Sequence, residues 1–133
     1  MPEINLNPDG PHSPDRTSEA GTLFDECSRF LTYATMSEKH GMEYPSDVYR
    51  LVADIYSAAG RLPQMCDQLG QFLGVQMDMR RLYEARNRDV PIQVSRAQSH
   101  LEDAASAARQ LTAALQAVQA DIAGLGVRED GDA

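Results

Sequence analysis

Apolar residues recur at intervals of three and four along four stretches of the chain, the spacing expected of amphipathic helices. Each stretch is bounded by a residue that starts or stops helices: Thr17 or Ser18, Ser46 and Asp89 are candidate caps, and Gly41 is a candidate stop. The predicted helices cover residues 18–40, 46–60, 62–88 and 91–123. The pattern therefore predicts an all-α fold.

The last stretch carries the longest heptad pattern of the chain. At about 1.5 Å per residue, its helix would be about 50 Å long and the preceding one about 40 Å. The short connection at residues 88–91 predicts that these two form a long coiled-coil-like hairpin, with the first two helices along part of it in an antiparallel four-helix bundle. The seam positions are Val94, Ala97, Leu101, Ala104, Ala108, Leu111, Leu115, Val118, Ile122 and Leu125.

The far end of this seam suggests an interface. If the shorter helices leave it uncovered, a second copy of the chain is the natural cover, which predicts a homodimer. The alternative is tight packing within one chain, which the small seam residues Ala97, Ala104 and Ala108 would allow. The candidate interface residues are Leu111, Leu115, Val118, Ile122 and Leu125.

The two ends of the chain differ in composition from the part between them. Residues 1–17 contain four prolines and few aliphatic residues, which predicts a disordered, extended arm. Residues 126–133 contain Glu129, Asp130 and Asp132, and are predicted to form a flexible acidic tail. The helical bundle is thereby assigned to residues 18–125.

Composition narrows the function. The net charge of −8 argues against a general nucleic-acid or anionic-membrane binder, because those surfaces attract clustered Lys and Arg. The chain has no Trp, and no apolar run is long enough to span a bilayer. Cys27 and Cys66 are interpreted as reduced thiols, and with no secretory signal at the start we expect a cytoplasmic protein.

Motifs for catalysis, cofactors and metals are missing from the sequence. There is no phosphate-binding loop, no nucleophile elbow, no H-E-x-x-H and no Cys-x-x-Cys. No Glu is followed three residues later by His, as di-iron helical bundles require. We therefore expect no catalytic, cofactor or metal site.

Two polar features stand out as candidate contacts. Arg80, Arg81 and Arg88 form a basic cluster in an acidic chain, in which Glu84 could bridge two arginines on one helical face. A solvated helix end explains such a cluster, and the alternative is contact with an anion or an acidic partner. Tyr49 and Tyr56 lie seven residues apart, either at the rim of the core or at an interface.

These patterns favour a non-enzymatic helical protein that acts through protein–protein contact, as a homodimer through its last helix. The alternative is a small-ligand or regulatory module with an apolar pocket between helices, lined by Met and Tyr side chains.

Overall fold

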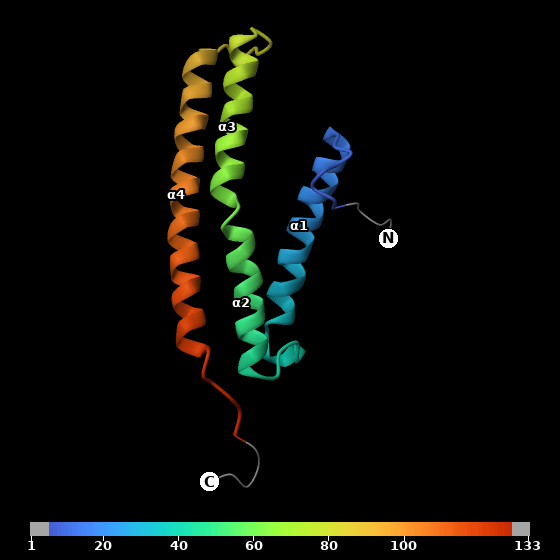
Figure 1. The fold of residues 1–133 in the computed structure, drawn as a ribbon. Helices are drawn as coiled ribbons and strands as arrows, with labels where there is room; N and C mark the ends of the chain where they lie inside the picture. Colours follow the sequence, from blue (N-terminus) through green and yellow to red (C-terminus); the bar gives the residue numbers. More distant parts are fainter. Residues whose placement is uncertain (1–5, 129–133) are drawn as a thin grey trace. The chain divides into compact units, whose positions relative to one another are not determined.

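The computed structural model describes residues 6–128, and every regular element in this range is helical (Figure 1). No strand occurs between these residues, which confirms the predicted all-α class. The elements are α1 (Pro14–Ala34), the short 3₁₀ helix η1 (Ser37–Lys39), α2 (Pro45–Ala59), α3 (Leu62–Asp78) and α4 (Val90–Ile122).

The chain divides into two compact units, Met1–Glu43 and Tyr44–Ala133. The first contains α1 and η1. In the second, α4 packs along both α3 and α2 (Figure 1). The long C-terminal helix therefore packs on the helices that precede it, as predicted, and the packing within this unit involves three helices rather than four.

Helix α1 starts before the predicted position. Ser13 is its N-cap, and the Ser13 hydroxyl accepts a hydrogen bond of 3.1 Å from the backbone N–H of Arg16. Pro14 occupies the first turn, where its fixed φ suits a helix and its missing N–H costs nothing. Residues 14–17, predicted to belong to the disordered arm, are thus helical, while residues 1–5 of that arm lie outside the described range.

The end of α1 also differs from the prediction, which placed it near His40. The helix ends at Ala34, and a separate turn of 3₁₀ helix follows before His40 adopts a left-handed conformation with φ 53°. Gly41 approaches this helix end closely, because a Cβ at Gly41 would collide with the carbonyl oxygen of Ala34. Gly41 therefore does not terminate α1, since it lies seven residues beyond Ala34 in the sequence. It is needed there because the two backbones approach closely.

Helix α2 lies within one residue of its predicted range, whereas α3 ends ten residues before Arg88. Arg80 terminates α3 in a left-handed conformation with φ 56°. Its N–H donates to the carbonyl of Met77 at 2.9 Å, and the N–H of Arg81 donates to that of Gln76 at 3.1 Å. These bonds form a Schellman ending, which usually has glycine at the left-handed position. Arg80 stands there instead, so no glycine marks this helix end along the chain.

Helix α4 begins as predicted, because the carboxylate of Asp89 accepts a hydrogen bond of 3.0 Å from the N–H of Ile92. It continues for 33 residues to Ile122. The acidic tail predicted from residue 126 is described only to residue 128, and residues 129–133 lie outside the described range.

The buried interior of the second unit is narrow and made of small residues. The buried hydrophobic side chains are those of Ala59, Val94, Ala105 and Ala108, and no large side chain is fully buried in the described part of the chain. Within residues 6–128, none of the helices combines the length and the apolar character that crossing a membrane requires.

Candidate functional site

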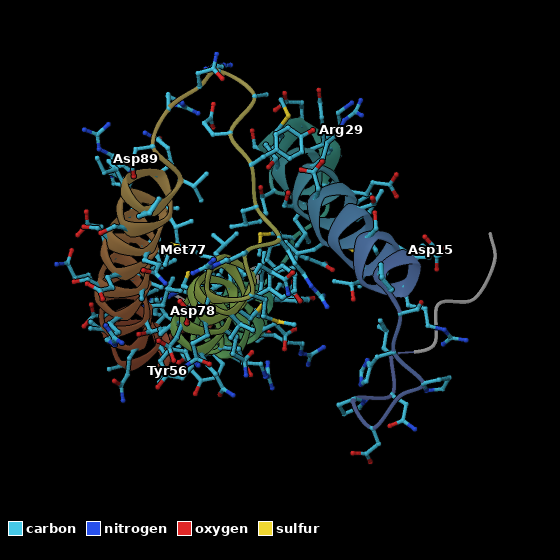
Figure 2. The ribbon with its side chains drawn as sticks, turned by 90° about the horizontal axis from the view of Figure 1, so that it is seen from above. Asp15, Arg29, Tyr56, Met77, Asp78 and Asp89 are labelled. Atoms are coloured by element: carbon cyan, nitrogen blue, oxygen red, sulfur yellow. The ribbon has the colours of Figure 1, made fainter. Side chains whose placement is uncertain are left out.

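The contact between α4 and the two preceding helices uses one regular row of residues on each side. Along α2 and α3, positions spaced by four and three are buried or half-buried, and Figure 2 shows one of them, Met77, between the ribbons of α3 and α4. We call these positions the inner row: Val52, Tyr56, Ala59, Pro63, Cys66, Gly70, Leu73 and Met77.

The matching row on α4 is Val94, Gln98, Leu101, Ala105, Ala108, Thr112, Leu115, Gln119 and Ile122. Half of the predicted seam belongs to it: the column that includes Val94, Leu115 and Ile122 faces α2 and α3. The other column is not covered within one chain, because Leu111, Val118 and Leu125 remain exposed at 44%, 37% and 60%.

The row on α4 also contains a polar residue that the apolar pattern did not include. Gln98 takes an inner position because its side-chain amide donates a hydrogen bond of 3.0 Å to the backbone carbonyl of Gly70. Gly70 has no side chain to shield that carbonyl, so the amide reaches it. Hydrophobicity alone does not identify such a position as buried.

A second regular row along α2 and α3, which ends at the α3 C-cap Met79, lies on one flank of the inner row. Its side chains include Leu69 and Phe72, which are 58% and 62% exposed. We call this set the outer row: Val48, Leu51, Ile55, Ala58, Leu62, Met65, Leu69, Phe72, Gln76 and Met79. Its spacing of three and four continues without interruption from α2 into α3, and it contains no charged residue.

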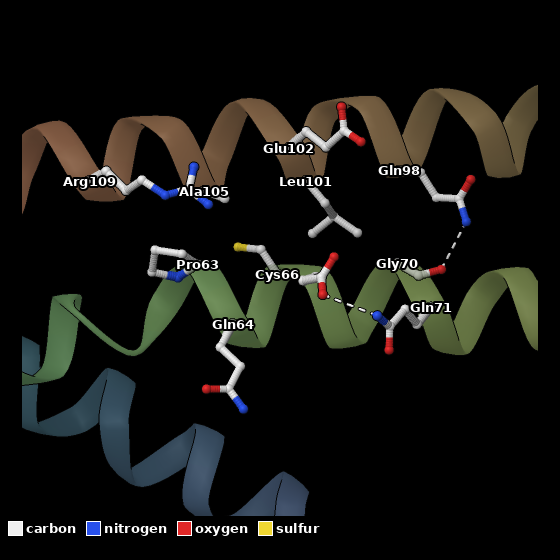
Figure 3. A pocket seen from close by; sticks show the side chains of 11 residues that line it. Pro63, Gln64, Cys66, Gly70, Gln71, Gln98, Leu101, Glu102, Ala105 and Arg109 are labelled. Carbon is white, nitrogen blue, oxygen red and sulfur yellow. Dashed lines mark hydrogen bonds between the residues drawn. The ribbon is translucent and has the colours of Figure 1, made fainter.

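A hollow of about 670 Å³ with a mixed polar and apolar lining lies on one side of the contact between α3 and α4 (Figure 3). Its charged lining includes Asp67, Glu102 and Arg109, and Asp67 accepts a hydrogen bond of 3.1 Å from the amide of Gln71. No Met or Tyr lines it, unlike the apolar pocket considered from the sequence. Sequence patterns did not indicate this hollow, because its residues come from two helices and form no motif.

The residues that line the hollow show which positions lie on each side of the α3–α4 pair. Asp67 and Gln71 each follow an inner residue of α3 by one position, and Glu102 and Arg109 do the same on α4. Residues that follow the inner rows therefore share one side of the pair. Residues that precede them share the other side.

That other side carries mostly apolar residues on both helices, interrupted on α4 by Gln93, His100 and Asp121. Leu69 precedes Gly70 on α3, and Leu111 precedes Thr112 on α4. We call the combined surface the outer face: the outer row of α2 and α3 together with Ala97, Ala104, Leu111 and Val118 of α4. The second unit thus presents the hollow, with its charged residues, on one side and the outer face on the other.

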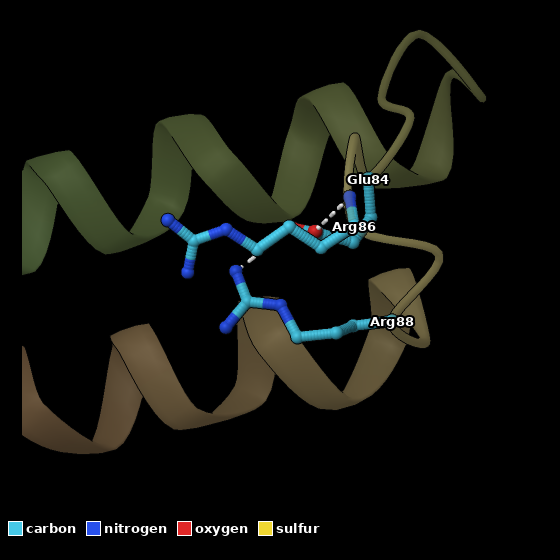
Figure 4. Close-up of polar contacts among 3 residues, drawn as sticks. All are labelled: Glu84, Arg86 and Arg88. Atoms are coloured by element: carbon cyan, nitrogen blue, oxygen red, sulfur yellow. Dashed lines mark hydrogen bonds and ion pairs between the residues drawn. The ribbon is translucent and has the colours of Figure 1, made fainter.

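The arginine cluster lies in the loop between α3 and α4, so it does not share the helical face expected for it. The expected bridge to one arginine still forms, since Arg88 donates to the Glu84 carboxylate at 3.0 Å, while the backbone N–H of Arg86 donates to the same group at 2.7 Å (Figure 4). The hydrogen bond from Arg88 and that from Arg86 lower the pKa of Glu84. Arg88 therefore has a structural partner within the loop, and its pKa is raised by Glu84.

The remaining candidates are spread over different surfaces. Arg80 and Arg81 are exposed at the end of α3. Tyr49 is exposed on α2, while Tyr56 is half-buried in the inner row, so neither belongs to the outer face. Leu111 and Val118 are the sequence candidates that the structure brings together with the outer row.

No group of three or more metal-binding side chains is present among residues 6–128. Comparison of the chain with protein-family models, with curated proteins and with solved structures gives no significant match.

Proposed function

We propose that this protein acts through protein–protein contact and associates through its outer face. The observation that carries the proposal is that six large apolar side chains of the outer row remain exposed, while the buried side chains are those of three alanines and one valine. The six are Val48, Ile55, Met65, Leu69, Phe72 and Met79. Contiguous apolar patches on soluble proteins mark interaction sites when they reach several hundred Å². A role in assembly requires no catalytic group, in keeping with the non-enzymatic function expected from the sequence.

The proposed partner is a second copy of the chain, and α4 contributes Leu111 and Val118 to the interface. In this proposal, the antiparallel four-helix bundle expected from the sequence forms between two copies, each supplying α4 and the continuous pair α2 and α3. Leu115 and Ile122 support the interface indirectly, because they are half-buried in the row of α4 that packs on α2 and α3.

Light scattering on a sizing column tests this association. Full-length protein at micromolar concentration is expected to have the mass of a dimer, and Val118→Asp is expected to have the mass of a monomer, because it places a charge in an apolar contact. Gln116→Asp is the matched control, because this exposed residue follows the inner residue Leu115 and so lies on the side of the hollow. A monomeric wild-type chain would overturn the proposal.

The hollow supports a second candidate, the binding of a small polar molecule. Its volume is within the range of ligand sites, and its lining offers carboxylates and one guanidinium. Such a lining fits a molecule with both an amino and a carboxyl group. A panel of amino acids should then raise the melting temperature of the wild-type protein and leave Arg109→Ala unchanged; no rise with any member contradicts this candidate.

A further inference from the structure

We infer that two copies pair through the outer face in one specific antiparallel register, with the two-fold axis level with Pro63 and Gln64. This inference rests on the proposed self-association and names the geometry of the contact. It follows from the symmetry of the outer row, from the level of α4 beside it, and from the charges at its edges.

The outer row is symmetric about its own midpoint. When two rows run in opposite directions with that midpoint on the axis, each position meets an apolar or uncharged counterpart. The layers are then Val48 with Met79, Leu51 with Gln76, Ile55 with Phe72, Ala58 with Leu69, and Leu62 with Met65, each pair formed between the two copies. Such layers fill the core of antiparallel helical bundles.

The apolar column on α4 has its own midpoint at the same height along the helix axes as the midpoint of the outer row. Its exposed column pairs Ala97 with Val118 and Ala104 with Leu111 of the second copy, around a midpoint between Ala107 and Ala108. Pro63 lies opposite Ala105 and Arg109 across the hollow (Figure 3), so the midpoint of the outer row and the midpoint of the α4 column lie at nearly the same height. One two-fold axis therefore satisfies both helices, which an unrelated partner would not require.

Charges at the edges favour this antiparallel arrangement over a parallel one. On α4, Arg96 and Asp121 are exposed beside the outer face, and they are centred within one residue of the α4 midpoint. In the antiparallel register each Arg lies near an Asp of the other copy. A parallel pairing of the same rows would place like charges together, which is unfavourable.

The size of the outer face suits a stable dimer. The row from Val48 to Met79 is about 46 Å long, and two adjacent helices present a width of about 18 Å. The resulting area of roughly 800 Å² per copy matches that of a stable complex. Helix α1, at 21 residues or about 31 Å, is too short to cover the row alone.

Spin-label distances between copies test the register. Cysteines introduced singly as Asp54→Cys and Arg61→Cys, in full-length protein carrying Cys27→Ser and Cys66→Ala, place labels at exposed positions beside the outer row. The register offsets Arg61 by about 8 Å from its equivalent in the second copy along the axis and Asp54 by about 28 Å. Pulsed dipolar spectra are therefore expected to show a distance about 15–20 Å longer for Asp54→Cys.

The possible results separate the two proposals. A dimer with similar distances at both positions overturns this register and leaves self-association standing. Absence of any dipolar signal, with a monomeric mass for the unlabelled protein, overturns both. Protection of Phe72 from solvent in a monomer would show that another segment covers the row, and would also overturn the register.

Discussion

At the scale of single residues, the loop between α3 and α4 depends on a few backbone and side-chain contacts. Arg80 accepts a left-handed conformation that costs an ordinary residue about 1–2 kcal/mol. The carboxylate of Glu84 then holds the loop through Arg88 and the N–H of Arg86. The first predicts the stability of an Arg80 variant, and the second predicts how the pKa of Glu84 depends on Arg88.

Replacing Arg80 by glycine should stabilise the protein. Glycine removes the left-handed strain but adds freedom to the unfolded chain, so a net gain of about 0.5–1 kcal/mol is expected in urea unfolding. Arg81→Gly is the matched control, since Arg81 is not left-handed, and it should destabilise. Equal losses in both variants would show that Arg80 does not end α3 in this way.

The pKa of Glu84 should depend on Arg88. The hydrogen bond from Arg88 lowers this pKa below its ordinary value of about 4.3. The carboxylate therefore contributes stability above that pH, and the contribution is lost as the pH falls through the lowered pKa. Carbon NMR titration should show the Glu84 midpoint rising toward the ordinary value in Arg88→Gln, while Arg86→Gln, which keeps the backbone donor, should change it little.

At the scale of the helices, the sequence predicted the start of α4 well because Asp89 caps it. Helix α2 was placed within one residue, but its N-cap is Tyr44, whose backbone N–H donates to the Asp47 carboxylate, and not the predicted Ser46. The end of α3 was missed, because an arginine replaces the glycine that usually marks such an ending. The outer row has the same spacing of three and four as the row that packs on α4, so spacing alone does not distinguish the two. Small residues such as Ala59 and Gly70 make close packing there, and hydrophobicity does not rank them above Leu69 or Phe72.

The two glycines of α3 should respond differently to alanine. A Cβ at Gly70 would lie 3.6 Å from Gln98 Cγ and 3.7 Å from Leu101 Cδ1, an ordinary contact. Gly70→Ala should therefore stabilise α3 by about 1 kcal/mol through helix propensity. At Gly74 the Cβ would lie 3.0 Å from the Gln98 Nε2 that bonds to Gly70, so a similar gain is offset by disturbing that bond.

Urea unfolding of the two variants, measured at one protein concentration, checks this expectation. Gly70→Ala should have the higher midpoint. The gain of Gly74→Ala should reappear when it is compared in a Gln98→Ala background, where the obstructing amide is absent. A loss of stability in Gly70→Ala would mean that α3 and α4 approach more closely than these contacts indicate.

At the scale of the whole molecule, the interior of the second unit is small for a unit of its length. Its buried side chains are three alanines and one valine, whereas burial of each large aliphatic or aromatic side chain contributes about 1.5–3 kcal/mol. The outer face holds the side chains that could supply this energy. The position of the large apolar side chains at the surface, more than any single motif, is therefore the feature of this fold that favours association.

Thermal stability should therefore rise with protein concentration. If folding and pairing are coupled, unfolding releases two chains, and mass action raises the melting temperature by about 3–4 °C for each tenfold increase in concentration. Calorimetry or circular dichroism between about 1 and 100 µM measures this slope directly. Val118→Asp should lower the melting temperature and flatten the slope, whereas Gln116→Asp should keep both, since its side chain lies outside the outer face. A wild-type melting temperature independent of concentration, with the mass of a monomer, would mean that the interior of one chain is sufficient for its stability.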